Sequence, residues 1–166
     1  MTHRKTRHPL FTFLLTVCLW LTPLGPTAAE QWSDTKPKIS LTHIFYGEIN
    51  SRGRPTGYHH RQNGQDQKTA RLKKILSLPN DFGVYTALIE VKDPATGIWK
   101  EKFSSLFPDH FTRQQIIDLI IKTYRTHPPK SRRKWGGMTN YGFRVEGYTL
   151  KDGRIITAYP IFEKDP

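Results

Sequence analysis

Two histidines sixteen residues apart, His43 and His59, are the side chains of this chain best suited to acid–base chemistry. His43 begins the run His-Ile-Phe-Tyr-Gly-Glu, and His59 ends the run Gly-Tyr-His. Histidine exchanges protons near neutral pH, so two of them brought together can serve as base and acid in one reaction. Because the chain has a formal net charge of +12, cleavage of RNA is the first reaction to consider.

The first 29 residues have the three-part pattern of a secretory signal peptide. Basic residues precede an apolar run from Leu10 to Leu24, and Thr27-Ala28-Ala29 supplies the small residues of a cleavage site. The run is short for a membrane span and contains Pro23, which favours cleavage over an uncleaved anchor. We therefore expect a signal peptide over residues 1–29 and one domain over residues 30–166. The protein would be secreted or periplasmic, without stable membrane association.

Cleavage would also change the composition of the chain. It removes the only cysteine, together with three of the 26 Lys and Arg residues and none of the 14 acidic residues. The remaining 137 residues carry a net charge of +9 and no disulfide, so the hydrophobic core alone must stabilise the fold. The positive charge favours a polyanionic partner such as RNA, although solubility alone could also account for it. No cluster of His and carboxylate residues has the spacing of metal ligands, so we predict no metal site.

Hydrophobic periodicity predicts a single α+β domain to position the histidines. We expect strands at residues 84–91, 98–103, 142–150 and 154–162, the last two joined as a hairpin by Lys-Asp-Gly. A capping box at Thr112 and isoleucines at helical spacing predict a helix that ends at about Thr126. Residues 41–49 are expected to form a short element that enters a loop. Residues 30–38 are expected to be a loose leader, and residues 51–69 an exposed, irregular, basic loop.

Thr157 and Tyr159 lie in the last predicted strand. Residues two apart on a strand project from the same face, so these two side chains should point together. Ile155 and Ile161 have the same parity, which is also the pattern of an ordinary half-buried strand. The pair therefore becomes informative only in combination with the histidine motifs.

Three motifs in register resemble the EndoU endoribonucleases. They are His-Ile-x-Tyr-Gly-Glu, Gly-Tyr-His and Lys-Asp-Gly-x-Ile-x-Thr-x-Tyr-Pro, in this order between residues 39 and 162. The chain is most similar to the bacterial EndoU toxins, and it also resembles the coronavirus uridylate-specific endoribonuclease. The resemblance implies a compact antiparallel sheet packed with helices, the fold shared with barnase-like and colicin-type ribonucleases. It further implies cleavage of single-stranded RNA, with a preference for uridine, to give a 2′,3′-cyclic phosphate.

The resemblance also implies roles for individual residues. His43 and His59 would be the catalytic pair, with His59 favoured as the base, although the sequence does not fix which histidine plays which part. His59 is chosen over His60 because the second histidine of the family follows Gly and one apolar residue. Thr157 would be the third catalytic residue, and Tyr159 would line the pocket for the phosphate and the base. Animal and viral members use a catalytic lysine, and no lysine motif here matches it: Lys100 and Lys102 are interpreted as solvated strand residues.

The remaining expectations concern partners. Arg52, Arg54 and Arg61 are expected to contact the RNA backbone. Trp135 ends a basic run, and it either stacks on a base or is tucked under a solvated loop. No cofactor is required, although weak stimulation by manganese stays open. The alternative function is a non-catalytic module of the same fold that binds RNA or another polyanion, and for a toxin an immunity protein is a candidate partner.

Overall fold

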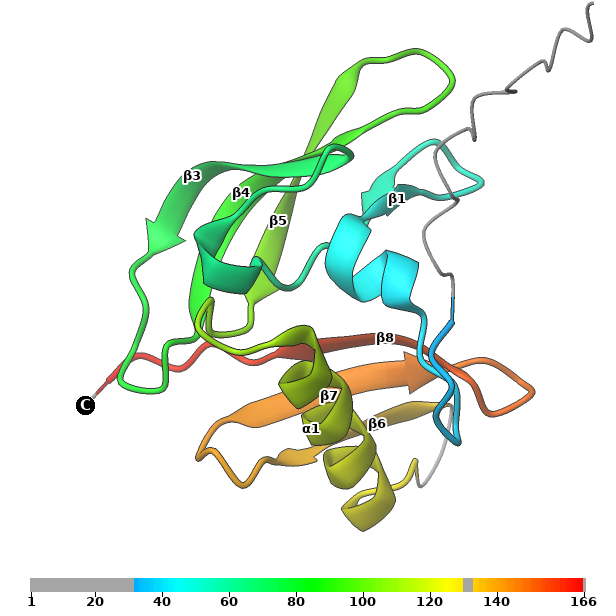
Figure 1. Cartoon of the computed structure of the whole chain (residues 1–166), viewed down its shortest axis with the longest axis vertical. Coiled ribbons are helices and arrows are strands. Elements are labelled where there is room, and N and C mark those ends of the chain that lie inside the picture. The colour runs from blue at the N-terminus through cyan, green and yellow to red at the C-terminus, as the bar shows by residue number, and fades with distance from the viewer. Residues whose placement is uncertain (1–31, 130–132, 166) are drawn as a thin grey trace, which may run out of the picture.

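The computed structural model describes residues 32–129 and 133–165, which form three small antiparallel sheets and one 14-residue helix (Figure 1). In chain order the elements are η1 (Thr42–Tyr46), β1 (Glu48–Ile49), β2 (Pro55–Thr56), η2 (Gln62–Gly64), β3 (Ala70–Ser77), β4 (Tyr85–Lys92), β5 (Trp99–Leu106), α1 (Arg113–Thr126), β6 (Lys134–Met138), β7 (Arg144–Thr149) and β8 (Ile155–Pro160). The predicted signal peptide lies outside the described residues. None of the helices within those residues has the length and apolarity needed to span a membrane.

The first sheet has the order β3-β4-β5, and the two-residue strands β1 and β2 pair beside it. Its central strand alternates as predicted, because Tyr85, Ala87, Ile89 and Val91 are buried on one face. These side chains form a core cluster with Tyr58, which lies in the segment that also carries His59. The hydrophobic face of this sheet therefore packs directly against one of the two histidine segments.

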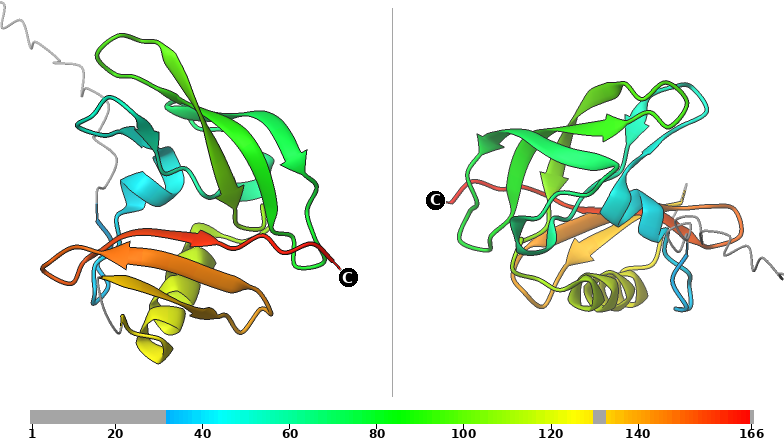
Figure 2. Two further views of the ribbon diagram at one scale, coloured as in Figure 1. Left: turned by 180° about the vertical axis from the view of Figure 1, so that it is seen from behind. Right: turned by 45° about the horizontal axis from the view of Figure 1, so that its top comes forward.

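The second sheet has the order β6-β7-β8, and α1 packs against it. The helix begins with the predicted capping box: the Thr112 hydroxyl accepts from the Gln115 amide, and the Gln115 side chain accepts from the Thr112 amide. Its isoleucine stripe packs in a core that includes Val145 and Ile155. The two sheets meet where β5 contacts β8, and η1 also packs on β8 (Figure 2).

The predicted α+β class is confirmed, but the single compact sheet is wrong, because the strands divide into separate sheets. Four strands were missed: the two-residue β1 and β2, and the longer β3 and β6. β3 is a lysine-rich edge strand whose register against β4 shifts twice, so its apolar residues do not alternate. β6 contains Gly136 and Gly137, which weaken a strand pattern. Gly137 is required because a Cβ there would lie 2.3 Å from the His127 ring.

Two segments are more ordered than expected. Residues 32–38 are not a loose leader, since Trp32 pairs with Ser40 and the Ser33 hydroxyl accepts from the Ile39 amide at 2.8 Å. The segment 51–69 is not uniformly exposed either. It contains β2 and η2, and its residues 57–60 are buried.

The predicted hairpin is confirmed, with a correction to its parity. The register between β7 and β8 shifts between Tyr148 and Thr149, which adds one residue to β8. Ile155 and Ala158 consequently both lie in the hydrophobic core, while Thr157 and Tyr159 are only partly buried. This bulge takes Ile155 out of the parity that the sequence assigned to it.

Candidate active site

The two histidines lie side by side where η1, the first sheet and β8 meet. Their ring centroids are 5.8 Å apart and the ring planes differ by 29°. Two backbone hydrogen bonds join their segments, since the Tyr58 amide donates to the His43 carbonyl and the His59 amide donates to the Ile44 carbonyl, each at 2.7 Å. The fifteen residues between the histidines therefore fold back on themselves and bring the rings together.

Gly57 makes this close approach possible. It has a φ of +74°, and a Cβ at this position would lie 2.1 Å from the His43 carbonyl oxygen. A side chain here would therefore separate the two histidine segments as well as strain the backbone. The next residue, Tyr58, also has a positive φ of 61°, and its buried hydroxyl donates to the Asp66 carboxylate at 3.2 Å.

Two acceptors fix the orientation and tautomer of His59. Its Nδ1 lies 3.0 Å from the Ser105 carbonyl oxygen and 3.1 Å from the Ser104 hydroxyl. Ser104 donates its own proton to the Tyr58 carbonyl at 2.9 Å, so its oxygen faces Nδ1 as an acceptor. A carbonyl oxygen can only accept, which places the imidazole proton on Nδ1 and leaves the lone pair on Nε2. His59 is thereby arranged as a base that acts through Nε2.

The surroundings of His59 also keep it neutral. Burial holds the pKa of His59 well below its ordinary value, and the charges of Lys102 and His43 lower it further. The side chain is 8% exposed, and removing an imidazolium from water is unfavourable at such a site. At neutral pH His59 is therefore in the form that accepts a proton.

Lys102 belongs to this site, which corrects the interpretation of it as a solvated strand residue. Its Nζ donates to the Gly57 carbonyl at 2.9 Å, immediately beside the histidine segment. Burial lowers the pKa of Lys102 to about 8. Lys102 lies on the same face of β5 as Ser104 and Leu106, which are buried, whereas Phe103 on the other face is exposed.

His43 has a different partner. Its Nδ1 donates to a carboxylate oxygen of Glu48 at 2.9 Å, and the ring is 13% exposed. A carboxylate on Nδ1 orients the ring and can stabilise an imidazolium that forms during a reaction. The two histidines thus differ in chemistry: His43 has an anionic partner, and His59 has neutral acceptors.

Strand β8 carries two hydroxyl residues, Thr157 and Tyr159, and Tyr159 lies beside His59. The Tyr159 ring centroid is 5.6 Å from that of His59, and burial raises the pKa of the Tyr159 hydroxyl, which keeps it protonated as a donor. Thr157 lies two residues before Tyr159 on the same strand. Its hydroxyl oxygen is enclosed and, among the residues the structure describes, has no hydrogen-bond partner. A buried hydroxyl without a partner is uncommon in proteins, and it distinguishes Thr157 from an ordinary strand residue.

His60 points away from the pair and packs its ring on Phe45, with centroids 5.7 Å apart. Burial lowers its pKa to about 4, so it is neutral at physiological pH. The choice of His59 over His60 therefore agrees with the geometry. Adjacent residues in an extended segment face opposite sides, and here only His59 meets His43.

Two of the residues predicted to bind RNA are placed elsewhere. Trp135 is 3% exposed and packs edge-to-face on Tyr124, so it belongs to the core of the second sheet and cannot stack on a base. Arg61 donates to Asp66 at 2.8 Å and lies 3.5 Å from Asp109. Its guanidinium therefore stabilises the loop that carries His59, and is not free to bind phosphate.

Arg52 and Arg54 are exposed in the turn between β1 and β2. Neither forms an ion pair with a carboxylate within residues 32–129 and 133–165. The same turn contacts β5, because the Lys100 ammonium donates to the Gly53 carbonyl at 3.0 Å. Within those same residues no group of three or more His, Cys, Asp or Glu side chains could hold a metal ion.

Comparison with known proteins identifies the family of this site. The model of the family described as bacterial EndoU nuclease matches residues 38–162, a span that includes both histidines, Lys102, Thr157 and Tyr159. The chain belongs to the bacterial EndoU nuclease family. The predicted resemblance to EndoU is therefore confirmed.

One curated relative of this EndoU chain is named "Toxin" and comes from Bacillus cereus strain ATCC 14579. The two are 35% identical over 124 residues, which is 73% of this chain and 22% of the relative. The EndoU chain therefore spans about a fifth of the length of that protein. No solved structure matches the chain significantly.

Proposed function

We propose that this EndoU nuclease is an endoribonuclease that cleaves single-stranded RNA by attack of the ribose 2′-hydroxyl. One observation carries the proposal: the His43 and His59 rings lie 5.8 Å apart and have chemically different partners. His43 donates to a carboxylate, whereas His59 donates to a carbonyl and is kept neutral by burial. Such a difference separates the acid from the base in one reaction.

In the proposed reaction, Nε2 of His59 removes the proton of the 2′-hydroxyl while the 2′-oxygen attacks the adjacent phosphorus. The bond from phosphorus to the 5′-oxygen breaks, and His43 donates its Nε2 proton to that leaving oxygen. The products are a 2′,3′-cyclic phosphate and a free 5′-hydroxyl, so no water molecule is consumed. Each proton transfer typically accelerates such a reaction about 10²–10⁴-fold.

The charge that develops on the phosphate oxygens needs fixed donors. Lys102 supplies a positive charge, and its hydrogen bond to the Gly57 carbonyl holds the ammonium beside the His59 segment. The Tyr159 hydroxyl is a second donor near His59. We assign Thr157 to the same site on the EndoU resemblance. Lys102 thus shares with Thr157 the third catalytic role, which the EndoU resemblance implied for Thr157 alone.

The preference for unpaired RNA follows from the in-line attack, which an unpaired nucleotide can adopt more readily than a nucleotide in a rigid duplex. Cleavage next to uridine is proposed from the EndoU resemblance, with Tyr159 and Thr157 as the residues that contact the base or phosphate. Arg52 and Arg54 are the proposed contacts to the RNA backbone. The reaction needs no metal ion in this proposal, so it should proceed in EDTA, and any manganese effect would be weak.

The proposal is tested with purified residues 30–166 and a labelled single-stranded RNA. We expect His43→Ala and His59→Ala each to lower the cleavage rate by at least 10²-fold while RNA affinity changes less than threefold. His110→Ala, which removes an exposed histidine outside the site, serves as the matched histidine control. A protein that binds RNA tightly and never cleaves it would support the alternative, a non-catalytic RNA-binding module.

We further propose that the nuclease is exported and acts as an antagonistic toxin. The name of the Bacillus cereus relative and the N-terminal pattern of residues 1–29 support this role. A secreted or periplasmic location, and an immunity protein that neutralises the enzyme in the producing cell, belong to the same proposal. N-terminal sequencing of exported protein should find Glu30 as the first residue, and retention of residues 1–29 would contradict export by cleavage.

A further inference from the structure

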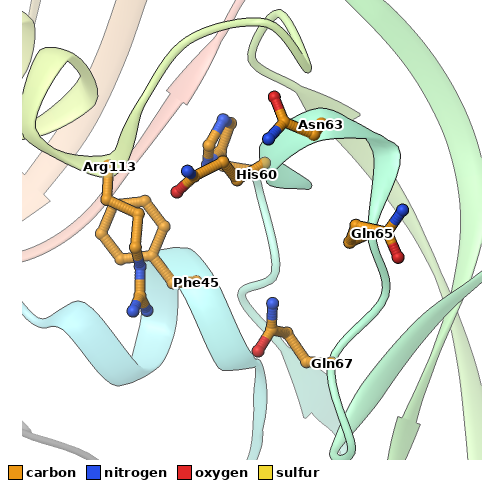
Figure 3. A pocket seen from close by; sticks show the side chains of 7 residues that line it. Phe45, His60, Asn63, Gln65, Gln67 and Arg113 are labelled. Atoms are coloured by element: carbon orange, nitrogen blue, oxygen red, sulfur yellow. The ribbon is translucent and has the colours of Figure 1, made fainter.

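A polar cavity lies on the other side of the segment that carries His59. It has a volume of about 300 Å³ and is lined by Phe45, His60, Gln62, Asn63, Gln65, Gln67 and Arg113. We call it the amide pocket, because four of these seven residues have amide side chains. Figure 3 shows the Gln67 amide pointing into the space beneath His60 and Asn63, with Arg113 placed over the Phe45 ring.

The four amides are not used by the fold. Within the part of the chain that the structure describes, none of the side chains of Gln62, Asn63, Gln65 and Gln67 forms a hydrogen bond with another protein group. By contrast, the amides of Gln114 and Gln115 on α1 both do. Each free amide offers a carbonyl acceptor and two N–H donors. The pocket therefore presents a concentrated set of donors and acceptors to a ligand.

The floor of the pocket is aromatic and its only charged lining residue is positive. Phe45 and the neutral His60 are each 2% exposed and pack edge-to-face. The Arg113 guanidinium carbon lies 4.5 Å from the Phe45 ring centroid and 4.6 Å from that of Tyr46. No carboxylate is among the residues that line the cavity. These properties suit a planar ligand with donor and acceptor edges and a negative charge.

We propose that the amide pocket binds one nucleotide outside the catalytic site. The amides would pair with the edge of the base, and Arg113 would pair with the phosphate. Amide side chains form such pairs with base edges, and a guanidinium binds phosphate in a forked geometry. A volume of about 300 Å³ is at the lower end of ligand pockets and fits a ligand of this size.

The pocket and the catalytic site are built from the same two segments. Phe45 follows His43 by two residues in η1, and His60 follows His59 directly. The histidine pair and the pocket thus lie back to back across the 59–60 backbone, since His59 stacks near Tyr159 while His60 packs on Phe45. A nucleotide bound there would contact both segments that position the catalytic rings.

The nucleotide could be part of a longer RNA substrate or a free mononucleotide. The first source rests on the proposed ribonuclease function, and the second does not. The probe for binding is uridine 5′-monophosphate, which has no phosphodiester to cleave, so binding is measured independently of catalysis. The variants are Gln67→Ala, which removes one pocket amide, and Gln114→Ala, which removes an exposed amide outside the pocket as the matched control.

Binding is followed by the side-chain NH₂ signals of the pocket amides in NMR spectra. We expect uridine 5′-monophosphate to shift the Gln62 and Gln67 signals and leave those of Gln114 in place. Gln67→Ala should weaken this binding at least tenfold, judged on the Gln62 signal, and Gln114→Ala should not change it. Two results together would overturn the proposal. The pocket signals would not shift at millimolar nucleotide, and the Gln67→Ala and Gln114→Ala variants would cleave short and long RNA equally well.

Cleavage kinetics then identify the source. If the pocket takes part of the substrate, Gln67→Ala should raise KM at least fivefold for a twelve-nucleotide RNA and leave a dinucleotide unaffected. If the pocket binds a free nucleotide, Gln67→Ala should have the same effect on KM for the twelve-nucleotide RNA and for the dinucleotide. The variant should still weaken the binding of uridine 5′-monophosphate in the NMR experiment. Nucleotide shifts in a protein that cleaves no RNA would refute the proposed function and support the pocket. Cleavage of RNA by a protein whose pocket signals do not shift and whose Gln67→Ala variant behaves as wild type would support the proposed function and refute the pocket.

Discussion

Lys102 gives the sharpest test of the site, because its pKa predicts how its contribution depends on pH. Burial lowers that pKa to about 8, so the Lys102 side chain is charged in about nine-tenths of the molecules at pH 7 and in about one-tenth at pH 9. If the positive charge stabilises the transition state, the contribution of Lys102 to kcat/KM should fall about tenfold between these two values. An arginine in the same position keeps its charge over this whole range.

The comparison is therefore made between wild type and Lys102→Arg. The two proteins differ only at residue 102, so the ratio of their kcat/KM values reports the charge at this position, including its effect on His59. Arginine has a different shape, and we expect Lys102→Arg to be slower than wild type at pH 7. The wild-type advantage should then shrink about tenfold by pH 9.

The assay is cleavage of a fluorescently quenched RNA oligonucleotide at substrate concentrations well below KM. Circular dichroism at both pH values establishes that the two proteins stay folded. A ratio that is constant from pH 7 to pH 9 would refute the reasoning, since Lys102 would then not act through its charge. A Lys102→Met variant that cleaves RNA as fast as wild type would refute it as well.

Three further predictions concern the residues around the histidines. Ser104→Ala removes one of the two acceptors of His59 Nδ1, so we expect kcat to fall about tenfold with unchanged RNA affinity and a shifted ¹⁵N signal of that ring nitrogen. An unchanged ring signal and an unchanged rate would contradict the positioning role. Gly57→Ala places a Cβ against the His43 carbonyl at a positive φ, so the free energy of unfolding measured in urea should fall by at least about 2 kcal/mol. An unchanged free energy of unfolding would mean that the two histidine segments are not held so closely. The pKa of His60 is about 4 in the folded protein, below its ordinary 6.5, so the unfolded chain binds more protons between these values and stability falls as the pH falls. From pH 7 to pH 5 the free energy of unfolding of wild type should fall by about 2 kcal/mol more than that of His60→Gln. An equal fall in the two proteins would contradict this.

The sequence was sufficient to predict elements with strong local signals. The helix from Arg113 to Thr126 has both its cap and its apolar stripe encoded within a few residues. The β7–β8 hairpin has its turn encoded by Lys-Asp-Gly. The pairing of His43 with His59 came from the order of three motifs, and the 5.8 Å approach of the rings agrees with it.

Features that depend on tertiary contacts were missed. β3 is an irregular edge strand paired on one side only, so its apolar residues carry no clear period. The role of Lys102 depends on its carbonyl partner at Gly57, 45 residues away in sequence, which a strand pattern cannot reveal. Trp135 resembled an exposed aromatic next to basic residues, and it is buried because the facing α1 supplies Tyr124. Arg61 resembled a free cation, and it is paired with two carboxylates.

The most direct measurement of the central claim uses an RNA with a single strong cleavage site and the same RNA with a deoxyribose at that site. The reaction is run in EDTA, and the product ends are identified by mass spectrometry. We predict a 2′,3′-cyclic phosphate and a 5′-hydroxyl from the RNA, and no cleavage at the deoxyribose. Cleavage that persists at the deoxyribose would contradict attack by the 2′-hydroxyl, and with it the assignment of His59 and His43 as base and acid.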